Sequence, residues 1–493
     1  MFKNKKSSKL FFVAETKLTN DKMEALRHCK YLCYLKYYLK PQLSYQIYSC
    51  FPDNLKLQPE IFMTPLLTAD YNGYQATFQE AMKLTIIIGQ FFGLNPVTGV
   101  SEIDTTKLRF QIQSCRFVYS LLSIIGQCTV VYFCLLELFT DSNPNLSSNS
   151  ALVFYVTNCI TTILFLRVAT RWPRLCQLIS KTEASDPSID RTLIKKCRVT
   201  SVLVLTMALL EHLLSDLSSI AGIIDCQKGE NVYEAFVVAG SPWIFQYTGY
   251  SPYVAIFTQI IGIQFTFNWN FSDVFVICIS FYLTSRLEQV NRRIESVFGK
   301  HTPSSFWRTL REDYSRITGL VRQVDDVIGS IIFISFANNL FFICLQLLHT
   351  LAEGIRRNPS CRLGEPDERP FQGYEQTIYF VYSFGFLITR SLAVSLIASR
   401  VHTASREPAH TLYFVPSTAY SVEVQRFLDQ IHGDTIALSG LKFFDVKRGL
   451  ILTIAGTIVT YELVLMQFTG VSPTPSPSTI TIPIFINSSY SKV

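Results

Sequence analysis

The stretch from Phe117 to Phe139 reads FVYSLLSIIGQCTVVYFCLLELF and contains one formally charged side chain, that of Glu137. A helix that crosses a bilayer needs about 20 mostly apolar residues, because it rises about 1.5 Å per residue through roughly 30 Å of hydrocarbon. This stretch therefore predicts a membrane-spanning helix. Further stretches meet the same test at residues 146–166, 199–224, 251–284, 327–351, 377–399 and 449–468. The sequence thus predicts an all-α, seven-transmembrane helical membrane protein.

The composition points the same way. Of the 493 residues, 48% are hydrophobic and 16% are charged, with a mean hydropathy of +0.25. Soluble domains usually carry about 25% charged residues, so this chain has too few to cover a large soluble surface. The 44 Lys and Arg residues do not gather with aromatic residues in a groove-like pattern, so we expect no nucleic-acid partner. Cys29 and Cys33 are the one close cysteine pair and lack the further ligands of a zinc site, so we expect no metal and no cofactor.

The distribution of basic residues predicts the orientation in the membrane. Lys and Arg are concentrated before the first predicted span and in the second, fourth and sixth connections, and they are scarce in the other connections. Short cytoplasmic loops are enriched in Lys and Arg, so we expect a cytosolic N-terminus and an extracellular C-terminus. Cys226 and Cys361 then lie on the oxidising side, where they form a disulfide or remain free thiols.

This orientation divides the chain into cytosolic and membrane parts. The short apolar run Leu84–Leu94 predicts a helix at the cytosolic interface, and residues 422–444 place apolar residues at helical spacing among polar ones. The predicted parts are a cytosolic region 1–108 with the interfacial helix near 78–96, four spans in 109–284, cytosolic helices in 285–326, two spans in 327–399, a cytosolic segment 400–448, the seventh span 449–468 and an extracellular tail 469–493.

Two familiar function classes find no support in the sequence. A cytosolic N-terminus opposes the topology of G-protein-coupled receptors, and the third and seventh spans lack the motifs of that class. The sequence contains no phosphate loop, nucleophile elbow or paired-carboxylate arrangement on a plausible soluble domain. We therefore expect no enzymatic activity and assign no catalytic residue.

The last predicted span carries a polar stripe. Its members recur at spacings of three and four residues and so share one helix face: Thr453, Thr457, Thr460, Val464 and Gln467. Such a stripe suits a subunit that contributes a helix to a water-filled pathway, because Thr and Gln hydrate ions without a fixed charge. In the alternative interpretation, each Thr bonds its own helix and packs against a neighbour.

The same span resembles a known family. The pair Thr460-Tyr461, followed after five residues by Gln467-Phe468, is similar to the closing motif of insect gustatory receptors. Further pieces resemble the sugar-sensing branch: Leu210-Glu-His-Leu213, Asn268-Trp-Asn-Phe-Ser-Asp273, Ala337-Asn-Asn-Leu340 and Thr435-Ile-Ala-Leu-Ser-Gly-Leu-Lys-Phe-Phe444.

The resemblance implies a homotetrameric or heterotetrameric ligand-gated cation channel in the plasma membrane of sensory neurons. It also implies that the last helix lines the pore, with Gln467 and Phe468 at the gate and Thr457, Thr460 and Val464 on the same helix. The cytosolic parts of the fourth to seventh helices would form an anchor between subunits.

Polar side chains inside the predicted spans suggest a ligand pocket. A charged group in hydrocarbon costs about 2.5–3.5 kcal/mol on insertion scales, so such groups usually face protein or a water-filled cavity. A sugar needs an aromatic plate and groups that bond paired hydroxyls. The candidates are Glu211, His212, Asp216, Asn268, Trp269, Asn339 and Tyr382. In the alternative interpretation these groups pair helices internally, as we expect for Asp273 with Arg390.

Three hypotheses follow. The first is a sugar-gated, poorly selective cation channel that acts as a receptor. The second is a membrane carrier that transports the sugar. The third is a subunit that gates only together with a related subunit.

Overall fold

The computed structural model describes most of the chain between residues 77 and 468. It omits residues 103, 141–145, 186–189, 191, 227–230, 298, 301, 354–370 and 418–419 within that range. The predicted cytosolic stretch before residue 77, the tail 469–493 and Cys361 lie outside the described residues.

The described residues form long helices and two short hairpins. The helices are α4 (Phe78–Phe91), α5 (Cys115–Thr140), α6 (Leu146–Ser185), α7 (Leu193–Cys226), α8 (Val232–Gly240), α9 (Pro242–Thr248), α10 (Pro252–Glu295), α11 (Ser304–Glu353), α12 (Glu375–Tyr413), α13 (Val422–Gly433) and α14 (Arg448–Phe468), with a 3₁₀ turn at Thr105–Lys107. Antiparallel pairs join β1 (Val97–Thr98) to β2 (Arg109–Phe110) and β3 (Ser439–Gly440) to β4 (Phe444–Asp445).

Among the described residues, five helices are long and apolar enough to cross a membrane. They are α5, Ser150–Ser185 of α6, α7, Ser304–Thr350 of α11, and α12. The apolar segment Arg448–Tyr461 of α14 is shorter than these five helices. The predicted fourth and seventh spans lie in α10 and α14 and are therefore not among these five.

The place of α10 in the bundle explains its polar sequence. This helix packs against α12, α7, α11, α6, α5 and α4. Its residues from Asn270 to Ser280 are buried without interruption, including the polar side chains of Asn270 and Asp273. Neighbouring helices surround this part of α10, so its polar side chains face protein rather than lipid.

Helix α4 enters the core of the bundle. Thr77 caps its N-terminus by accepting a hydrogen bond from the backbone N–H of Glu80. The Phe78 ring packs 4.8 Å from that of Tyr282, and Met82 and Ile86 are buried. At the other end, a Cβ on Gly89 would come within 2.5 Å of the Phe271 ring, so only glycine allows this approach. The helix therefore rests against α7 and α10 rather than lying separately from the bundle.

The helical spacing in residues 422–444 extends beyond the helix that forms. Helix α13 ends at Gly433, and the chain continues into the β3–β4 hairpin. Leu441 and Lys442 take positive φ angles of 51° and 63° at the turn, a conformation that no helix continues. Ile436 and Leu438 are still buried, but they reach the core from extended backbone.

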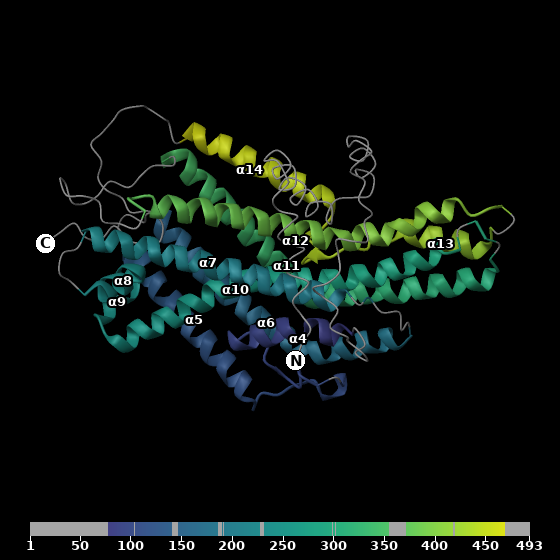
Figure 1. Ribbon diagram of the computed structural model, residues 1–493, viewed down its shortest axis with the longest axis horizontal. Coiled ribbons are helices and arrows are strands. Elements are labelled where there is room, and N and C mark those ends of the chain that lie inside the picture. The colour runs from purple at the N-terminus through teal and green to yellow at the C-terminus, as the bar shows by residue number, and fades with distance from the viewer. Residues whose placement is uncertain are drawn as a thin grey trace, which may run out of the picture. The chain divides into compact units, whose positions relative to one another are not determined.

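The predicted pore helix and the two ends of the bundle lie in different parts of the fold. Helix α14 lies along α11 and α12, on the side of the bundle away from α4 and α5 (Figure 1). Helix α13 lies at one end of the bundle, and α8 and α9 lie at the other (Figure 1). Cys226, at the end of α7, is disulfide-bonded.

Candidate functional site

An ion pair lies at the centre of the bundle between α10 and α12. The Nε atom of Arg390 is 3.0 Å from an Asp273 carboxylate oxygen, and the two side chains are 2% and 0% exposed. Ser335 donates a hydrogen bond to the same carboxylate, and Asn339 donates another over 3.1 Å. The two charges therefore leave water together and keep hydrogen-bond partners, as a buried ion pair requires.

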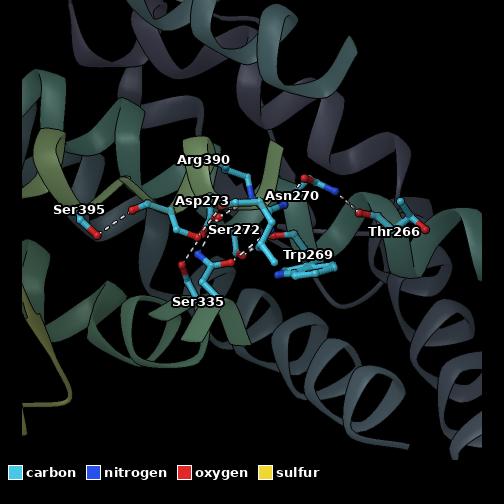
Figure 2. A network of polar contacts seen from close by, with 11 residues as sticks. Thr266, Trp269, Asn270, Ser272, Asp273, Ser335, Arg390 and Ser395 are labelled. Carbon is cyan, nitrogen blue, oxygen red and sulfur yellow. Dashed lines mark hydrogen bonds and ion pairs between the residues drawn. The ribbon is translucent and has the colours of Figure 1, made fainter. Parts of the chain in front are cut away.

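The guanidinium of Arg390 has further partners. It donates to the Oδ1 atoms of Asn270 and Asn339, and its central carbon lies 4.7 Å from the centroid of the Trp269 ring. Figure 2 shows Arg390 of α12 beside Asp273 and Asn270 of α10, with Ser335 of α11 close to Asp273. The expectation that Asp273 and Arg390 pair is confirmed by this distance.

Two of the predicted ligand residues belong to this network. Asn339 uses both ends of its amide, because Nδ2 donates to Asp273 and Oδ1 accepts from Arg390. The ring of Trp269 is flanked by Arg390 and by Phe342, whose centroid is 4.8 Å away. These contacts fit the alternative in which polar groups fix the helices to one another.

A second polar cluster joins α7, α11 and α12. Glu211 accepts a hydrogen bond of 2.6 Å from the Ser383 hydroxyl, which in turn accepts one of 3.3 Å from Gln346. Tyr382 donates over 2.9 Å to the carbonyl of Met207, one turn before Glu211. One carboxylate, one amide and two hydroxyls thus meet among three helices.

The other polar residues of α7 continue along the same helix. His212 lies 3.6 Å from the Asp216 carboxylate, four residues further along. Their side chains are 24% and 34% exposed, in contrast to the closed environment of Asp273. Among the predicted ligand residues, His212 and Asp216 are therefore partly exposed, and Glu211 and Tyr382 are half-buried.

Asn268 faces a third set of partners. Its Nδ2 atom donates over 2.9 Å to Thr162 of α6, and Thr162 donates to Gln127 of α5. The chain continues through Ser123 and Gln264 to the Tyr119 hydroxyl. Asn268 and Trp269 are adjacent in sequence, but their side chains contact different partners.

Several contributing residues were not expected from the sequence. Ser383 and Ser335 look like ordinary small residues in a span, and their hydroxyls matter only because a carboxylate lies opposite. Ser335 precedes Asn339 by four residues, a spacing that places both on one helix face and could have indicated the pair.

The polar stripe of α14 is described as far as Val464. The hydroxyls of Thr453, Thr457 and Thr460 each donate to the carbonyl four residues earlier, over 2.9–3.2 Å. Much of the helix is nevertheless uncovered, since Leu452 is 77% and Leu463 is 57% exposed. The side chains of Gln467 and Phe468 lie outside the described residues.

Metal-ligating side chains do not gather in the described part of the chain. Within those residues, no group of three or more His, Cys, Asp or Glu side chains is arranged to hold a metal ion.

Solved structures with a similar fold are insect olfactory receptors. The olfactory receptor OR5 of Machilis hrabei matches with a TM-score of 0.57, 16% identity and coverage of 78% of this chain and 97% of that one. The same receptor in complex with eugenol matches with a TM-score of 0.55 and 16% identity, over 79% of this chain and 98% of that one. The fold defines a helical, multi-pass membrane protein.

Sequence comparison gives the family. The family described as trehalose receptor matches residues 67–476. Gustatory receptor 5a for trehalose of Drosophila melanogaster is 33% identical over 80% of this chain and 86% of its own length. The gustatory receptor for sugar taste 64f of the same organism is 33% identical over 80% and 81%. The chain belongs to this family, the sugar-sensing branch of the insect gustatory receptors, which confirms the resemblance carried by the motif in α14.

Proposed function

We propose that this protein is a sugar-gated, non-selective cation channel that acts as a sweet-taste receptor in the plasma membrane of sensory neurons. The observation that carries the proposal is the contact of the Glu211 carboxylate with Ser383, which joins α7 to α12 beside Gln346 of α11. A carboxylate in an apolar helix is costly, and such groups mark ligand or ion pathways. Its neighbours present the hydroxyl and amide groups that a sugar would replace as partners.

The accessible residues define the ligand end of the proposed mechanism. In the proposed topology, with a cytosolic N-terminus, α7 runs outwards and Asp216 lies further out than Glu211. A sugar entering from outside would meet His212 and Asp216 first and then compete for the hydrogen bond between Glu211 and Ser383. Any ligand that binds one arrangement of α7 and α12 more tightly shifts the equilibrium between closed and open states.

The other end of the mechanism is α14. Its exposed apolar surface in the single chain supports assembly with further copies or related subunits, and a tetramer would bring four stripes of Thr457, Thr460, Val464 and Gln467 together. Phe468 would then form the gate at the end of the stripe. The names of the relatives favour trehalose and other sugars as the first ligands to test.

Patch recording on cells that express the full chain tests the proposal. Glu211→Gln should raise the half-maximal sugar concentration by about tenfold or more, because a hydrogen bond to a charged group contributes about 1.5–3 kcal/mol. Ser219→Ala is the control on α7, since the Ser219 hydroxyl donates to the Ser215 carbonyl of its own helix. An unchanged dose response in Glu211→Gln at equal surface expression would contradict the assignment of the pocket.

The same cells separate the competing hypotheses. Uptake of radiolabelled sugar without sugar-evoked current would favour the carrier. Current that appears only on coexpression with a related receptor would favour a subunit that cannot gate alone. For the pore, Gln467→Ala should alter the relative permeability of cations, and an unchanged permeability sequence would remove Gln467 from the conduction path.

A further inference from the structure

Helices α4 and α5 lie on the side of the bundle away from α14 (Figure 1), and a groove opens between residues of α4, α5 and α10. Its volume is about 500 Å³, and it lies where the end of α4 meets α5 and α10. The lining residues are Gln90, Phe91, Phe92, Tyr119, Ile260, Ile263 and Gln264. Neither the ligand cluster at Glu211 nor the stripe on α14 includes any of them.

The walls of the groove are apolar and exposed. Phe91 is 76% exposed, Ile260 is 53% exposed and Ile263 is 45% exposed. Exposed apolar patches mark contact surfaces, and in the proposed topology α5 and α10 cross the membrane while α4 lies at its cytosolic interface. Apolar chains rather than water therefore meet these side chains.

The floor of the groove is polar but internally satisfied. The Tyr119 hydroxyl donates over 2.9 Å to the Phe91 carbonyl and accepts from Gln264 over 3.1 Å. Gln90 donates its amide to the carbonyl of Val97 over 2.7 Å. These bonds fix the shape of the groove, so an occupant does not need to order it.

A cation lies next to Gln90, one of the residues that line the groove. Arg116 donates Nη1 to the Val97 carbonyl over 2.7 Å, the same oxygen that Gln90 engages. Its guanidinium is therefore held beside the groove, one helical turn before Tyr119 on α5. Arg116 is exposed, and no acidic partner is recorded for it among the described residues.

The position along α5 places this cation at the inner surface of the membrane. Helix α5 begins at Cys115 on the proposed cytosolic side, so Arg116 lies within its first turn. Further along α5, Ser123 bonds Gln264 and Gly126 lies against Ile261 of α10. The apolar wall therefore runs from Phe91 towards Ile260, deeper in the bilayer. A fixed cation at the headgroup level and an apolar groove at the acyl level match a single amphipathic molecule.

We propose that this groove binds an anionic glycerophospholipid of the inner leaflet. The phosphate lies against Arg116, and one acyl chain fills the groove between Phe91, Ile260 and Ile263. Anionic lipid is favoured over neutral lipid because the cation carries no acidic partner among the described residues and faces the cytosolic leaflet, where anionic lipids concentrate.

Photolabelling of the full-length protein tests the site. The purified protein is placed in nanodiscs of phosphatidylcholine with a tracer of either phosphatidylglycerol or phosphatidylcholine that carries a photoactivatable acyl chain. We expect the phosphatidylglycerol tracer to label peptides that contain Phe91 and Ile263 more strongly than the phosphatidylcholine tracer. Unlabelled phosphatidylglycerol should compete for this labelling.

Two variants separate the headgroup from the acyl chain. Arg116→Gln should lower labelling by phosphatidylglycerol by about fivefold, the factor expected for one basic residue near an anionic surface, and leave labelling by phosphatidylcholine unchanged. Ile263→Trp should fill the groove and lower labelling by both tracers. The matched controls are Arg171→Gln on α6 and Ile125→Trp on a lipid-facing part of α5 outside the groove, and both should label as the wild type does.

Three results would overturn the proposal. Equal labelling by the two tracers would indicate ordinary surrounding lipid. An equal loss in Arg116→Gln and Arg171→Gln would indicate general charge attraction. Labelling that rises several-fold when residues 1–76 are deleted would indicate that the chain's own N-terminal segment occupies the groove. Should Ile263→Trp fail to fold, competition by unlabelled phosphatidylglycerol in the wild type decides between site and surface.

Discussion

Asn339 has both ends of its amide engaged, with Nδ2 donating to Asp273 and Oδ1 accepting from Arg390. Glu211, by contrast, has a hydroxyl partner in Ser383 and no ion-pair partner among the described residues. Both residues are polar groups in apolar helices, so their types alone do not distinguish a structural role from a ligand-binding role. What distinguishes them is the direct contact, because Asn339 bonds both members of the buried ion pair whereas Glu211 bonds the Ser383 hydroxyl.

The ion pair of Asp273 with Arg390 predicts a strong effect on stability. Removing one partner of a buried pair leaves an uncompensated charge and costs about 3–5 kcal/mol. Asp273→Asn or Arg390→Met should therefore lower the yield of monodisperse protein and its thermal unfolding midpoint sharply. The measurement is fluorescence-detected size-exclusion chromatography after heating.

Arg400→Gln provides the control for this prediction. Arg400 pairs with Glu288 over 3.1 Å, but the two side chains are 45% and 31% exposed, so the pair should contribute about 0–1 kcal/mol. The double variant Asp273→Asn/Arg390→Met should recover part of the lost stability, because neither unpaired charge remains. Equal midpoints for Asp273→Asn and Arg400→Gln would count against a stabilising pair.

His402 predicts a pH effect in the proposed cytosolic part of α12. Burial lowers the pKa of His402 below the ordinary value of 6.5. The Ile436 carbonyl, 3.1 Å from Nδ1, raises this pKa and so opposes the effect of burial. The charges of Lys447 and Arg406 lower the pKa further. The folded state then binds fewer protons than the unfolded state as pH falls below 6.5, so the contribution of His402 to stability is lost in that range.

The test compares thermal midpoints at pH 7.5 and pH 5.5, with both values chosen about one unit from the ordinary histidine pKa. His402→Asn keeps a side-chain donor without the titration, so it should lose less stability than the wild type on acidification. His410→Asn changes an exposed histidine on the same helix and is the control. An identical pH dependence in wild type and His402→Asn would exclude His402 as the source.

At the scale of elements, apolar periodicity predicts helices well and their ends poorly. Each predicted span lies within one helix, apart from Ser251, which is the N-cap of α10, because about 20 apolar residues have no other stable arrangement in lipid. The hairpin after α13 was not predicted, since Ile436 and Leu438 continue the apolar spacing while the backbone has already become extended. Its cause lies far away in sequence, in a carboxylate on α11.

That carboxylate belongs to Asp325, which fastens the β3–β4 hairpin to α11. It accepts bonds from the Ser439 backbone N–H, the Ser439 hydroxyl and the Lys442 ammonium over 2.5–2.8 Å, and it is 3% exposed. The bond from Lys442 raises the pKa of that ammonium. The hairpin leads directly into α14, so the contact couples α11 to the proposed pore helix.

Loss of this contact should change gating more than folding. Asp325→Asn keeps the volume and one acceptor but removes the charge that holds Lys442, so we expect an altered open probability at saturating sugar. Single-channel recording measures it. Asp326→Asn is the neighbouring control, because Asp326 is 65% exposed and lies 3.2 Å from the same ammonium. Equal effects of the two variants would show that only the charge near Lys442 matters and not the anchored hairpin.

At the scale of the molecule, the single chain leaves α14 incompletely covered. It packs against α11 and α12 only on one side, and Leu452, Val459 and Leu463 are all more than half exposed. Helix α14 also carries the polar stripe, whose Thr453, Thr457 and Thr460 hydroxyls donate to carbonyls of the same helix. The sequence could reveal the stripe through its spacing, but only the packed structure reveals that α11 and α12 leave the helix surface open.

Cysteine accessibility can tell which surface of α14 meets water in the assembled protein. In an assembly around a shared pathway, Thr460→Cys should react with a water-soluble methanethiosulfonate reagent and lose sugar-evoked current, whereas Val459→Cys, one position round the helix, should keep its current. Both residues are exposed in the single chain, so the free molecule does not predict a difference between them. If Thr460→Cys reacts only in the presence of sugar, the closed gate lies on the extracellular side of this position. Equal reaction at both positions would contradict a pathway lined by the stripe. Protection of both residues would mean that lipid or protein covers α14 on all sides, and the channel proposal would then lose its pore.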